Sequence, residues 1–207
     1  MIKQPTKKQV MIVSGVLIGI AVILGICTAF LYQVRYVHSE STTVAKVADL
    51  FRMDMAVVDG ETIPYSSYLL HAKAERTFLN SPMAKQDGST GEFGTVEEQQ
   101  AFDRALRVAA VDALAKTHNL NVTSQDVDAA FTQLLAQASS TDAGEIDAFL
   151  REQFGWSTDE FKLYVLKPAI IEETLRDTLS QSTGNPTAFE DALNDVLDNK
   201  TKRYLKF

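Results

Sequence analysis

The 207-residue sequence has very little of the chemistry on which many protein classes depend. Its one cysteine, Cys27, excludes an intramolecular disulfide, a redox-active cysteine pair and a cysteine-rich zinc site. The three histidines, His38, His71 and His118, have none of the spacings that metal-binding motifs require. A phosphate-binding glycine loop, a dinucleotide fingerprint, a zinc-protease motif and a Ser–His–Asp arrangement are absent as well. We therefore expect no catalytic residues, no metal site and no cofactor.

Acidic residues are absent from the first 39 positions. The basic residues of that region are Lys3, Lys7, Lys8 and Arg35, so residues 36–207 contain 16 basic and 27 acidic residues, a net charge of -11. A domain with this charge repels nucleic acid and anionic lipid headgroups. Nucleic acid is therefore not an expected partner.

One long uncharged run lies near the N-terminus, from Met11 to Tyr32. As a helix its 22 residues span about 33 Å, which matches a hydrocarbon core of about 30 Å. Three lysines precede the run and only Arg35 closely follows it, so the positive-inside rule places the N-terminus in the cytoplasm. We predict a cytoplasmic tail at 1–9, a single transmembrane helix at 10–34 and an extracytoplasmic remainder, in a periplasm or at the cell exterior.

Two other fates of this run fit the residues less well. A cleaved signal peptide has a shorter apolar region and small residues before the cut, and Cys27-Thr28-Ala29 is a poor version of that site. Lipidation of Cys27 needs a small residue immediately before it, where Ile26 stands. An uncleaved anchor is the interpretation that we favour.

The remainder is predicted to be mainly α-helical with a small β-hairpin or short sheet. Residues 35–54 are expected to form a linker with a short helix, and residues 55–207 a multi-helix domain. Asp59-Gly60 lies between two apolar runs and predicts a hairpin with a type I′ turn, in which both central residues take positive φ. The predicted helices cover about residues 44–52, 64–79, 95–118, 123–135, 142–154, 157–180 and 188–198.

Local signals refine these helices. Pro64 suits the first turn of its helix, and Thr95-x-x-Glu98 and Ser157-x-x-Glu160 predict capping boxes. A second proline, at position 168, predicts a kink or break two residues earlier. Residues 80–94 are expected to form a long loop.

The C-terminal residues alternate between polar and apolar side chains, as a strand does. We expect Arg203–Phe207 to pair with the hairpin, because a hairpin of two strands is marginal alone. Leu205 and Phe207 are then expected on the core side.

A group of aromatic residues surrounds a Gly-Trp turn: Phe149, Phe154, Trp156, Phe161 and Tyr164. Aromatic residues at helical spacing usually form core, but an exposed aromatic patch marks an interaction surface. The candidates for polypeptide binding are Phe93, Phe149, Phe154 and Trp156.

Three segments resemble the N-terminal chaperone domain of SurA, which is also found in PrsA-like foldases and parvulin-type prolyl isomerases. The first is AVVDGETI at 56–63, followed by a helix; the second is AKTHNLNV at 115–122, followed by TSQDVD; the third is FLREQFGWSTDEF at 149–161. The resemblance covers about residues 55–179. It implies binding of unfolded or secreted polypeptides, without a cofactor.

The resemblance does not extend to an isomerase domain of roughly a hundred residues, because only a short loop, 181–187, is expected where the family inserts it. The leading hypothesis is thus a membrane-anchored, chaperone-like module. Alternatives are a scaffolding subunit that docks one membrane partner, or a degenerate prolyl isomerase.

The predicted topology can be tested with a protease added outside intact cells stripped of any outer wall. Because the basic residues lie before the apolar run, we expect digestion of residues 36–207 and protection of residues 1–8. Protection of the large domain would show that the orientation is wrong.

Overall fold

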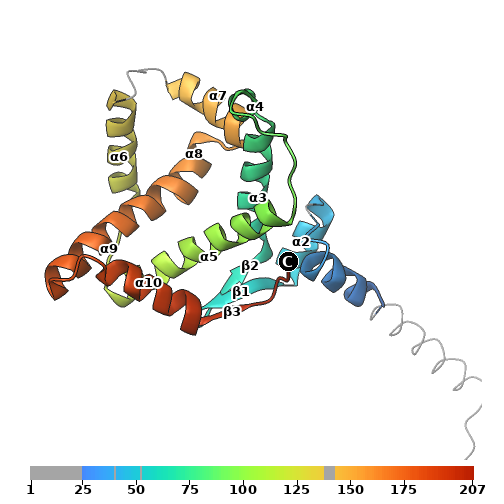
Figure 1. The fold of residues 1–207 in the computed structure, drawn as a ribbon, viewed down its shortest axis with the longest axis horizontal. Coiled ribbons are helices and arrows are strands. Elements are labelled where there is room, and N and C mark those ends of the chain that lie inside the picture. Colours follow the sequence, from blue (N-terminus) through green and yellow to red (C-terminus); the bar gives the residue numbers. More distant parts are fainter. Residues whose placement is uncertain (1–24, 40, 52, 138–142) are drawn as a thin grey trace, which may run out of the picture.

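The protein is described by a computed structural model of residues 25–39, 41–51, 53–137 and 143–207. It is mainly helical with one small antiparallel sheet, which confirms this part of the predicted fold class (Figure 1). The predicted tail and most of the predicted transmembrane run lie outside the described residues. Residues 25–35 are helical, and across the described ranges no helix is both long and apolar enough to cross a membrane.

The sheet contains the predicted hairpin, with strands β1 (Asp54–Val58) and β2 (Glu61–Pro64). The turn residues Asp59 and Gly60 have φ of 48° and 85°, so the type I′ prediction is confirmed. The pairing is irregular between Asp54 and Ala56. This bulge explains why Met55 and Ala56, which are neighbours in sequence, are both buried, whereas a regular strand would alternate.

The third strand, β3 (Thr201–Arg203), pairs with β1 and gives the order β2-β1-β3. The predicted return of the C-terminus to the hairpin is confirmed, but the paired segment begins two residues before Arg203. The Tyr204 N–H still donates to the Met55 carbonyl at 2.9 Å. Beyond it Leu205 is 5% exposed and Phe207 37% exposed, so only the first fully joins the core.

The helices follow the predicted order with shifts of one to three residues at most of their ends. They are α2 (Thr42–Leu50), α3 (Tyr65–Asn80), α4 (Pro82–Gln86), α5 (Thr95–Thr117), α6 (Ser124–Gln137), α7 (Ala143–Phe154), α8 (Thr158–Phe161), the π-helix η1 (Lys162–Leu166), α9 (Lys167–Thr183) and α10 (Ala188–Asn199). The short helix α4 interrupts the predicted loop at 80–94. It forms because the Ser81 hydroxyl accepts from the Ala84 N–H and Pro82 needs no hydrogen bond in the first turn.

The long helix α5 lies at the centre of the core, packed against α3, α9, α10 and β1. Its buried surface combines Phe102 and Leu106 with small side chains such as Ala105 and Ala110. Alanine keeps the helix surface narrow, which lets neighbouring helices approach closely on more than one side. Ala109 of α5 is partly buried, and Lys116 at the end of α5 is exposed.

The start of α5 corrects one predicted cap. The Gly94 N–H donates to Glu97 Oε2 at 2.9 Å, and Thr95 is already helical, so the box lies one residue earlier than Thr95-x-x-Glu98. Glu98 instead accepts a hydrogen bond from His38 Nδ1 at 2.9 Å. Pro64, in turn, lies just before α3 rather than in its first turn.

The second predicted cap is confirmed, since Ser157 and Glu160 exchange hydrogen bonds at the start of α8. A kink or a break is predicted before Pro168, and the structure has a local irregularity there but no break. The helix runs on without interruption, and a π-helical turn directly precedes Lys167. Because Pro168 has no N–H, it cannot continue the ordinary ladder, and a π turn accommodates this loss.

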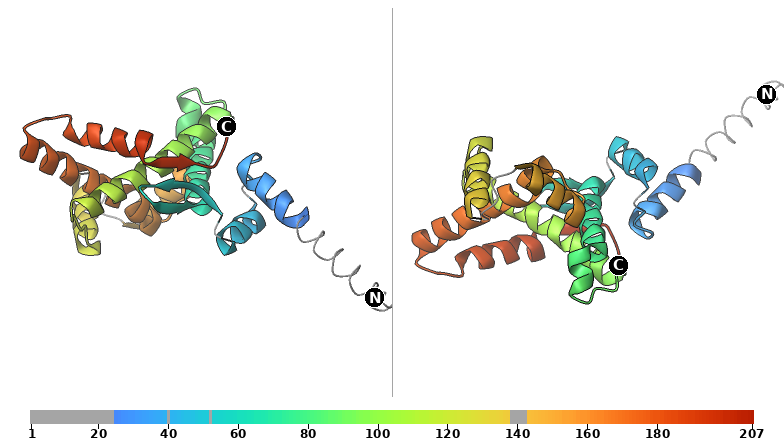
Figure 2. Two further views of the ribbon diagram at one scale, coloured as in Figure 1. Left: turned by 90° about the horizontal axis from the view of Figure 1, so that it is seen from below. Right: turned by 90° about the horizontal axis from the view of Figure 1, so that it is seen from above.

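The segment predicted as a linker, 35–54, packs on the domain. Val34, Val44 and Ala48 belong to the same hydrophobic core as the helices that follow. Figure 2 shows the helix at 25–35 and α2 together at one end of the molecule, close to the C-terminus. The predicted domain of 55–207 is thus extended by these residues.

Closure of the sheet can be tested with Leu205→Ala, which removes the buried side chain beyond β3. Large-to-small changes in a core cost about 2–5 kcal/mol, so we expect a clearly lower urea midpoint. Lys202→Ala, an exposed position in β3, is the matched control and should leave the midpoint nearly unchanged. Equal midpoints for both variants would show that the C-terminal residues do not stabilise the domain.

Candidate binding cleft

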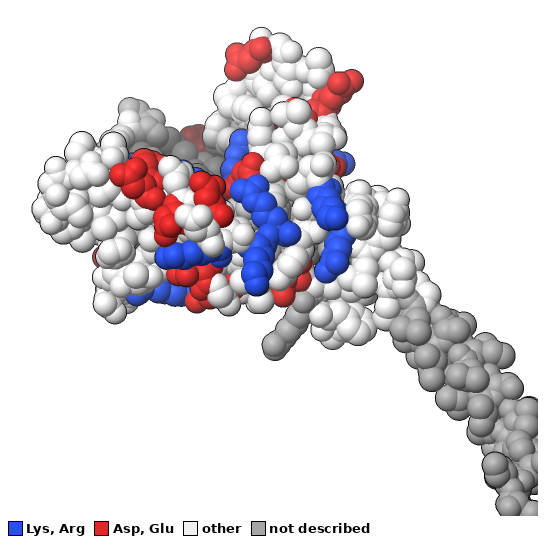
Figure 3. Space-filling model, turned by 60° about the horizontal axis from the view of Figure 1, so that its bottom comes forward, with Lys and Arg blue, Asp and Glu red and all other residues white. Residues whose placement is uncertain are grey.

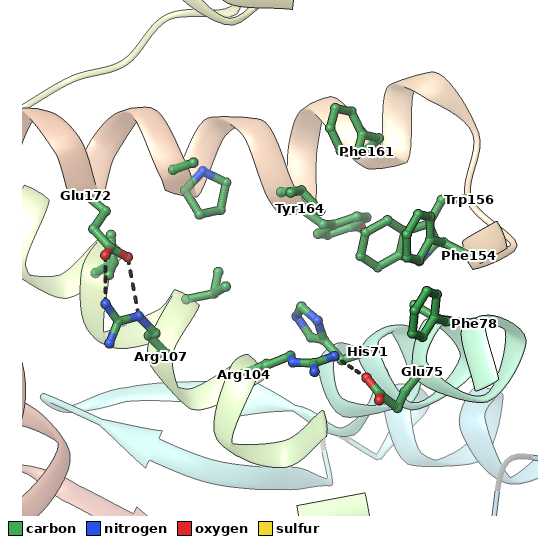
Figure 4. A pocket seen from close by; sticks show the side chains of 16 residues that line it. His71, Glu75, Phe78, Arg104, Arg107, Phe154, Trp156, Phe161, Tyr164 and Glu172 are labelled. Atoms are coloured by element: carbon green, nitrogen blue, oxygen red, sulfur yellow. Dashed lines mark hydrogen bonds and ion pairs between the residues drawn. The ribbon is translucent and has the colours of Figure 1, made fainter. Parts of the chain in front are cut away.

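A cavity of about 480 Å³ lies between α3 and α5 on one side and the α8–η1–α9 run on the other (Figure 4). Its size falls within the roughly 300–1,000 Å³ of typical ligand pockets. Sixteen residues line it, and most of its surface is apolar. We call it the cleft.

A sharp turn between α7 and α8 brings the aromatic end of the cleft against α3. Gly155 has φ of +69°, and a Cβ at this position would lie 3.1 Å from Thr77 Oγ1 on α3. Glycine meets both demands, the left-handed backbone and the close approach, without strain. The turn thereby fixes Phe154 and Trp156 on either side of it, next to α3.

Five aromatic side chains gather at this end of the cleft, as Figure 4 shows: Phe78, Phe154, Trp156, Phe161 and Tyr164. The rings of Phe78 and Phe154 are stacked, with centroids 5.6 Å apart and planes at 5°. The ring centroid of Trp156 lies 6.2 Å from that of Phe154. Tyr164 extends from the opposite wall, and the ring of Phe161, on the same wall, lies against Phe131 of α6 with centroids 6.4 Å apart. Flat rings on two walls form a surface that receives apolar groups of varied shape.

The charged side chains of the cleft are arranged in pairs. Arg104 of α5 binds Glu75 of α3, and Arg107 of α5 binds Glu172 of α9 at 2.7 Å. Arg176 also binds Glu172, at 2.9 Å, which links the pair to the outer surface of α9. Each arginine in the cleft is thus neutralised by a carboxylate, and the lining attracts neither anions nor cations strongly.

The pKa values of two residues in the cleft, Glu172 and His71, lie below their ordinary values. Burial acts to raise the pKa of Glu172, but the hydrogen bonds and charges of Arg107 and Arg176 outweigh it and hold that pKa below its ordinary value. Burial lowers the pKa of His71 to about 4, and the positive charge of Arg104 adds to this effect. At neutral pH His71 is therefore an uncharged part of the cleft.

A smaller cavity of about 240 Å³ adjoins the cleft toward β2 and shares His71, Val108, Tyr164 and Pro168 with it. Asp112 of α5, a partly buried acid, lines this smaller cavity. Burial raises the pKa of Asp112, and the positive charges of Lys167 and Lys116 oppose this. The two cavities together extend the concave surface along α5 from the aromatic end to the sheet.

The four predicted binding residues lie in three different settings. Phe154 and Trp156 line the cleft. Phe149 lies outside it, 46% exposed, with its ring edge-on to Phe154 at 6.5 Å. Phe93 packs against the core elsewhere, and the Arg76 guanidinium lies 4.6 Å above its ring.

Sequence reasoning missed the walls contributed by α3 and α5. These are His71 and Phe78 on α3, and Arg104 and Arg107 on α5. On α3 the sequence contains a signal for this wall, because His71, Glu75 and Phe78 are spaced so that they lie on one face of a helix. No pattern in the sequence indicates which residues of α9 lie opposite them.

The comparisons with known proteins give no relative. No protein-family model matches the chain, and neither a curated protein nor a solved structure shows significant similarity to it. The resemblance to the SurA N-terminal domain therefore rests on the sequence motifs alone. Over the described residues, no cluster of three or more His, Cys, Asp or Glu side chains could hold a metal ion.

The neutral state of His71 makes the stability of the domain depend on pH. Between about pH 6.5 and 4 the unfolded chain binds a proton at this histidine and the folded chain does not. The stabilisation is complete above pH 6.5 and is lost as the pH falls. We expect the free energy of unfolding to drop by about 2 kcal/mol from pH 7 to pH 5 through this group.

His71→Gln removes the titration and keeps a neutral polar side chain. Urea unfolding at pH 5 and 7 should show the drop in the wild type and not in the variant. His38, His118 and the carboxylates are common to both chains and cancel in the comparison. Parallel pH profiles would show that His71 titrates normally.

Proposed function

We propose that this chain is a membrane-anchored, extracytoplasmic module that resembles the SurA N-terminal chaperone domain. In this proposal the cleft binds apolar segments of non-native or secreted polypeptides, reversibly and without a cofactor or ATP. The run from Met11 to Tyr32 anchors the chain, with the N-terminus in the cytoplasm. The observation that carries the proposal is the two-walled aromatic end of the cleft.

The lining of the cleft favours a polypeptide ligand over a charged small molecule. Because Arg104 and Arg107 are already paired with carboxylates, an anionic ligand would have to displace Glu75 or Glu172. An apolar side chain would displace only water from the rings and gain the burial of its surface. Binding of this kind tolerates many sequences, as a chaperone requires.

The motifs behind the resemblance supply much of this surface. The hairpin motif leads directly into α3, which carries His71 and Phe78. The third motif contains the end of α7, the Gly155 turn and α8, and so supplies Phe154, Trp156 and Phe161. The segments that resemble a chaperone domain thus include those that line the cleft.

Prolyl isomerase activity is not part of the proposal. Helix α9 ends at Thr183 and α10 begins at Ala188, so four residues connect the helices between which the two-part family members carry their isomerase domain.

Binding in the cleft can be tested with a substitution that narrows its mouth. Ala169 of α9 lines the cleft and is otherwise exposed, so Ala169→Phe fills space without disturbing the core. Ala129→Phe on α6, exposed and outside the cleft, is the matched control. We expect the full-length wild type and Ala129→Phe to suppress aggregation of a chemically unfolded client, and Ala169→Phe to lose most of this effect.

Trp156 gives a direct readout, because it is the one tryptophan of the sequence. An apolar, tryptophan-free peptide should change its fluorescence in the wild type and the control, and several-fold less at equal concentration in Ala169→Phe. If neither clients nor peptides bind the wild type, the proposal is wrong. Tight binding of one partner without binding of unrelated clients would favour the scaffolding subunit instead.

A further inference from the structure

A second apolar groove, of about 510 Å³, lies between the helix at 25–35 and the end of α2. Ile26 and Leu31 line one side, and Val47 and Phe51 line the other. The two helices are joined by a tight connection around His38, whose φ is +49°. Residues 25–39 and 41–51 therefore form a hairpin of two helices with an apolar groove between them.

The apolar side chains of this hairpin are unusually exposed. Leu50 is 77% and Phe51 is 63% exposed, and Ile26, Tyr32 and Tyr36 each expose more than half of their surface. In Figure 3 the described surface next to the grey N-terminal residues is largely white, whereas coloured Lys, Arg, Asp and Glu side chains gather over the middle of that face. Apolar surface concentrated at one end of a protein marks a contact with a partner or a membrane.

The position of the groove along the chain indicates what covers it. Ile26 and Leu31 belong to the uncharged run that the sequence predicts to cross a membrane. Phe51 lies across the same groove from these residues. The end of α2 is therefore next to the part of the chain that is predicted to lie in the membrane. Tyr32 and Tyr36, stacked at 5.5 Å and both exposed, lie where an interfacial aromatic belt would be.

The polar residues of α2 set the depth at which it can lie. Lys46 and Asp49 are exposed on the same short helix as Leu50. A helix with exposed charges on it does not enter the hydrocarbon core, but it can lie in the interfacial zone with its apolar side chains inward. An acidic domain gains nothing from anionic headgroups, so the contact depends on apolar burial.

We propose that the helix at 25–35 and α2 form a membrane-seated hairpin, with Leu50 and Phe51 inserted in the interfacial zone of the bilayer. The domain then lies against the membrane instead of moving freely on a tether. This inference rests on the proposed anchor, and it adds a second attachment on the other arm of the hairpin.

The experiment uses the full-length chain in phosphatidylcholine vesicles, with an environment-sensitive fluorophore on a single cysteine. Cys27, the native cysteine, reports on the anchor. In a Cys27→Ser background, Phe51→Cys reports on the end of α2. Leu163→Cys is the matched control, because Leu163 is a similarly exposed apolar residue, at 52%, on η1.

Vesicles that contain nitroxide-labelled lipid should quench the probes at Cys27 and at position 51 at least twofold, and the probe at position 163 should be unaffected. Quenching at Cys27 without quenching at position 51 overturns the inference and leaves the anchor in place. Absence of quenching at both positions overturns the anchor and the inference together. In a further outcome, the lipid fails to quench the probe at position 51 while its emission reports an apolar environment only at high protein concentration. This result would show that a second copy of the chain covers the groove, and it would overturn the inference.

Discussion

The pairing of β3 with β1 is the interaction on which the rest of the structure depends. It joins the last strand of the chain to the first, and so closes α3 to α10 into one unit. Helix α10 leads directly into β3, which holds the α9–α10 pair against α5. An ion pair between Arg203 of β3 and Asp103 of α5, at 3.1 Å, joins the same two parts. Without this closure α9 would keep only its direct contacts with α5 and would lose the support of α10.

The cleft is a consequence of that arrangement. At one end α9 is tied to α5 by Arg107 and Glu172, while at the other end the Gly155 turn ties the α7–α8 corner to α3. The chain between these two attachments contains the π turn at Lys162–Leu166. A π turn inserts an extra residue into the helix and so rotates the side chains before it relative to those after it. Here it lies between Phe161 and Pro168, both of which line the cleft.

Local chemistry made much of the fold predictable from the sequence. The Asp59-Gly60 turn, the Ser157 cap and the stop at Gly155 each depend on one or two residues whose backbone preferences are strong. The predicted cap at Thr95 is wrong because Gly94 takes the N-cap position, and its N–H donates to Glu97. Glycine is nearly as favourable as threonine at an N-cap, but it has no side-chain oxygen that would reveal the cap in the sequence.

The cleft itself could not be predicted, because it depends on the angle between helices and not on any single segment. Phe154 and Trp156 were recognised as candidates from their aromatic character. Their partners on α3 and α5 belong to helices with buried faces of ordinary composition, and only the packing shows that one edge of each face stays open. Phe93 is the opposite case: its aromatic side chain in a glycine-rich loop predicts binding, but it packs against the core.

The two apolar surfaces of the molecule are separated by α3, and this separation bears on how the proposed activities can coexist. Helix α3 contacts both α2 and α7, and the groove of the hairpin and the cleft have no lining residue in common. A bilayer against Phe51 would leave the Trp156 end of the cleft open to the aqueous side. The net charge of -11 on residues 36–207 repels anionic headgroups over the remaining surface. Apolar contact at one end, opposed by charge elsewhere, would then orient the domain on the membrane with its cleft accessible to a polypeptide.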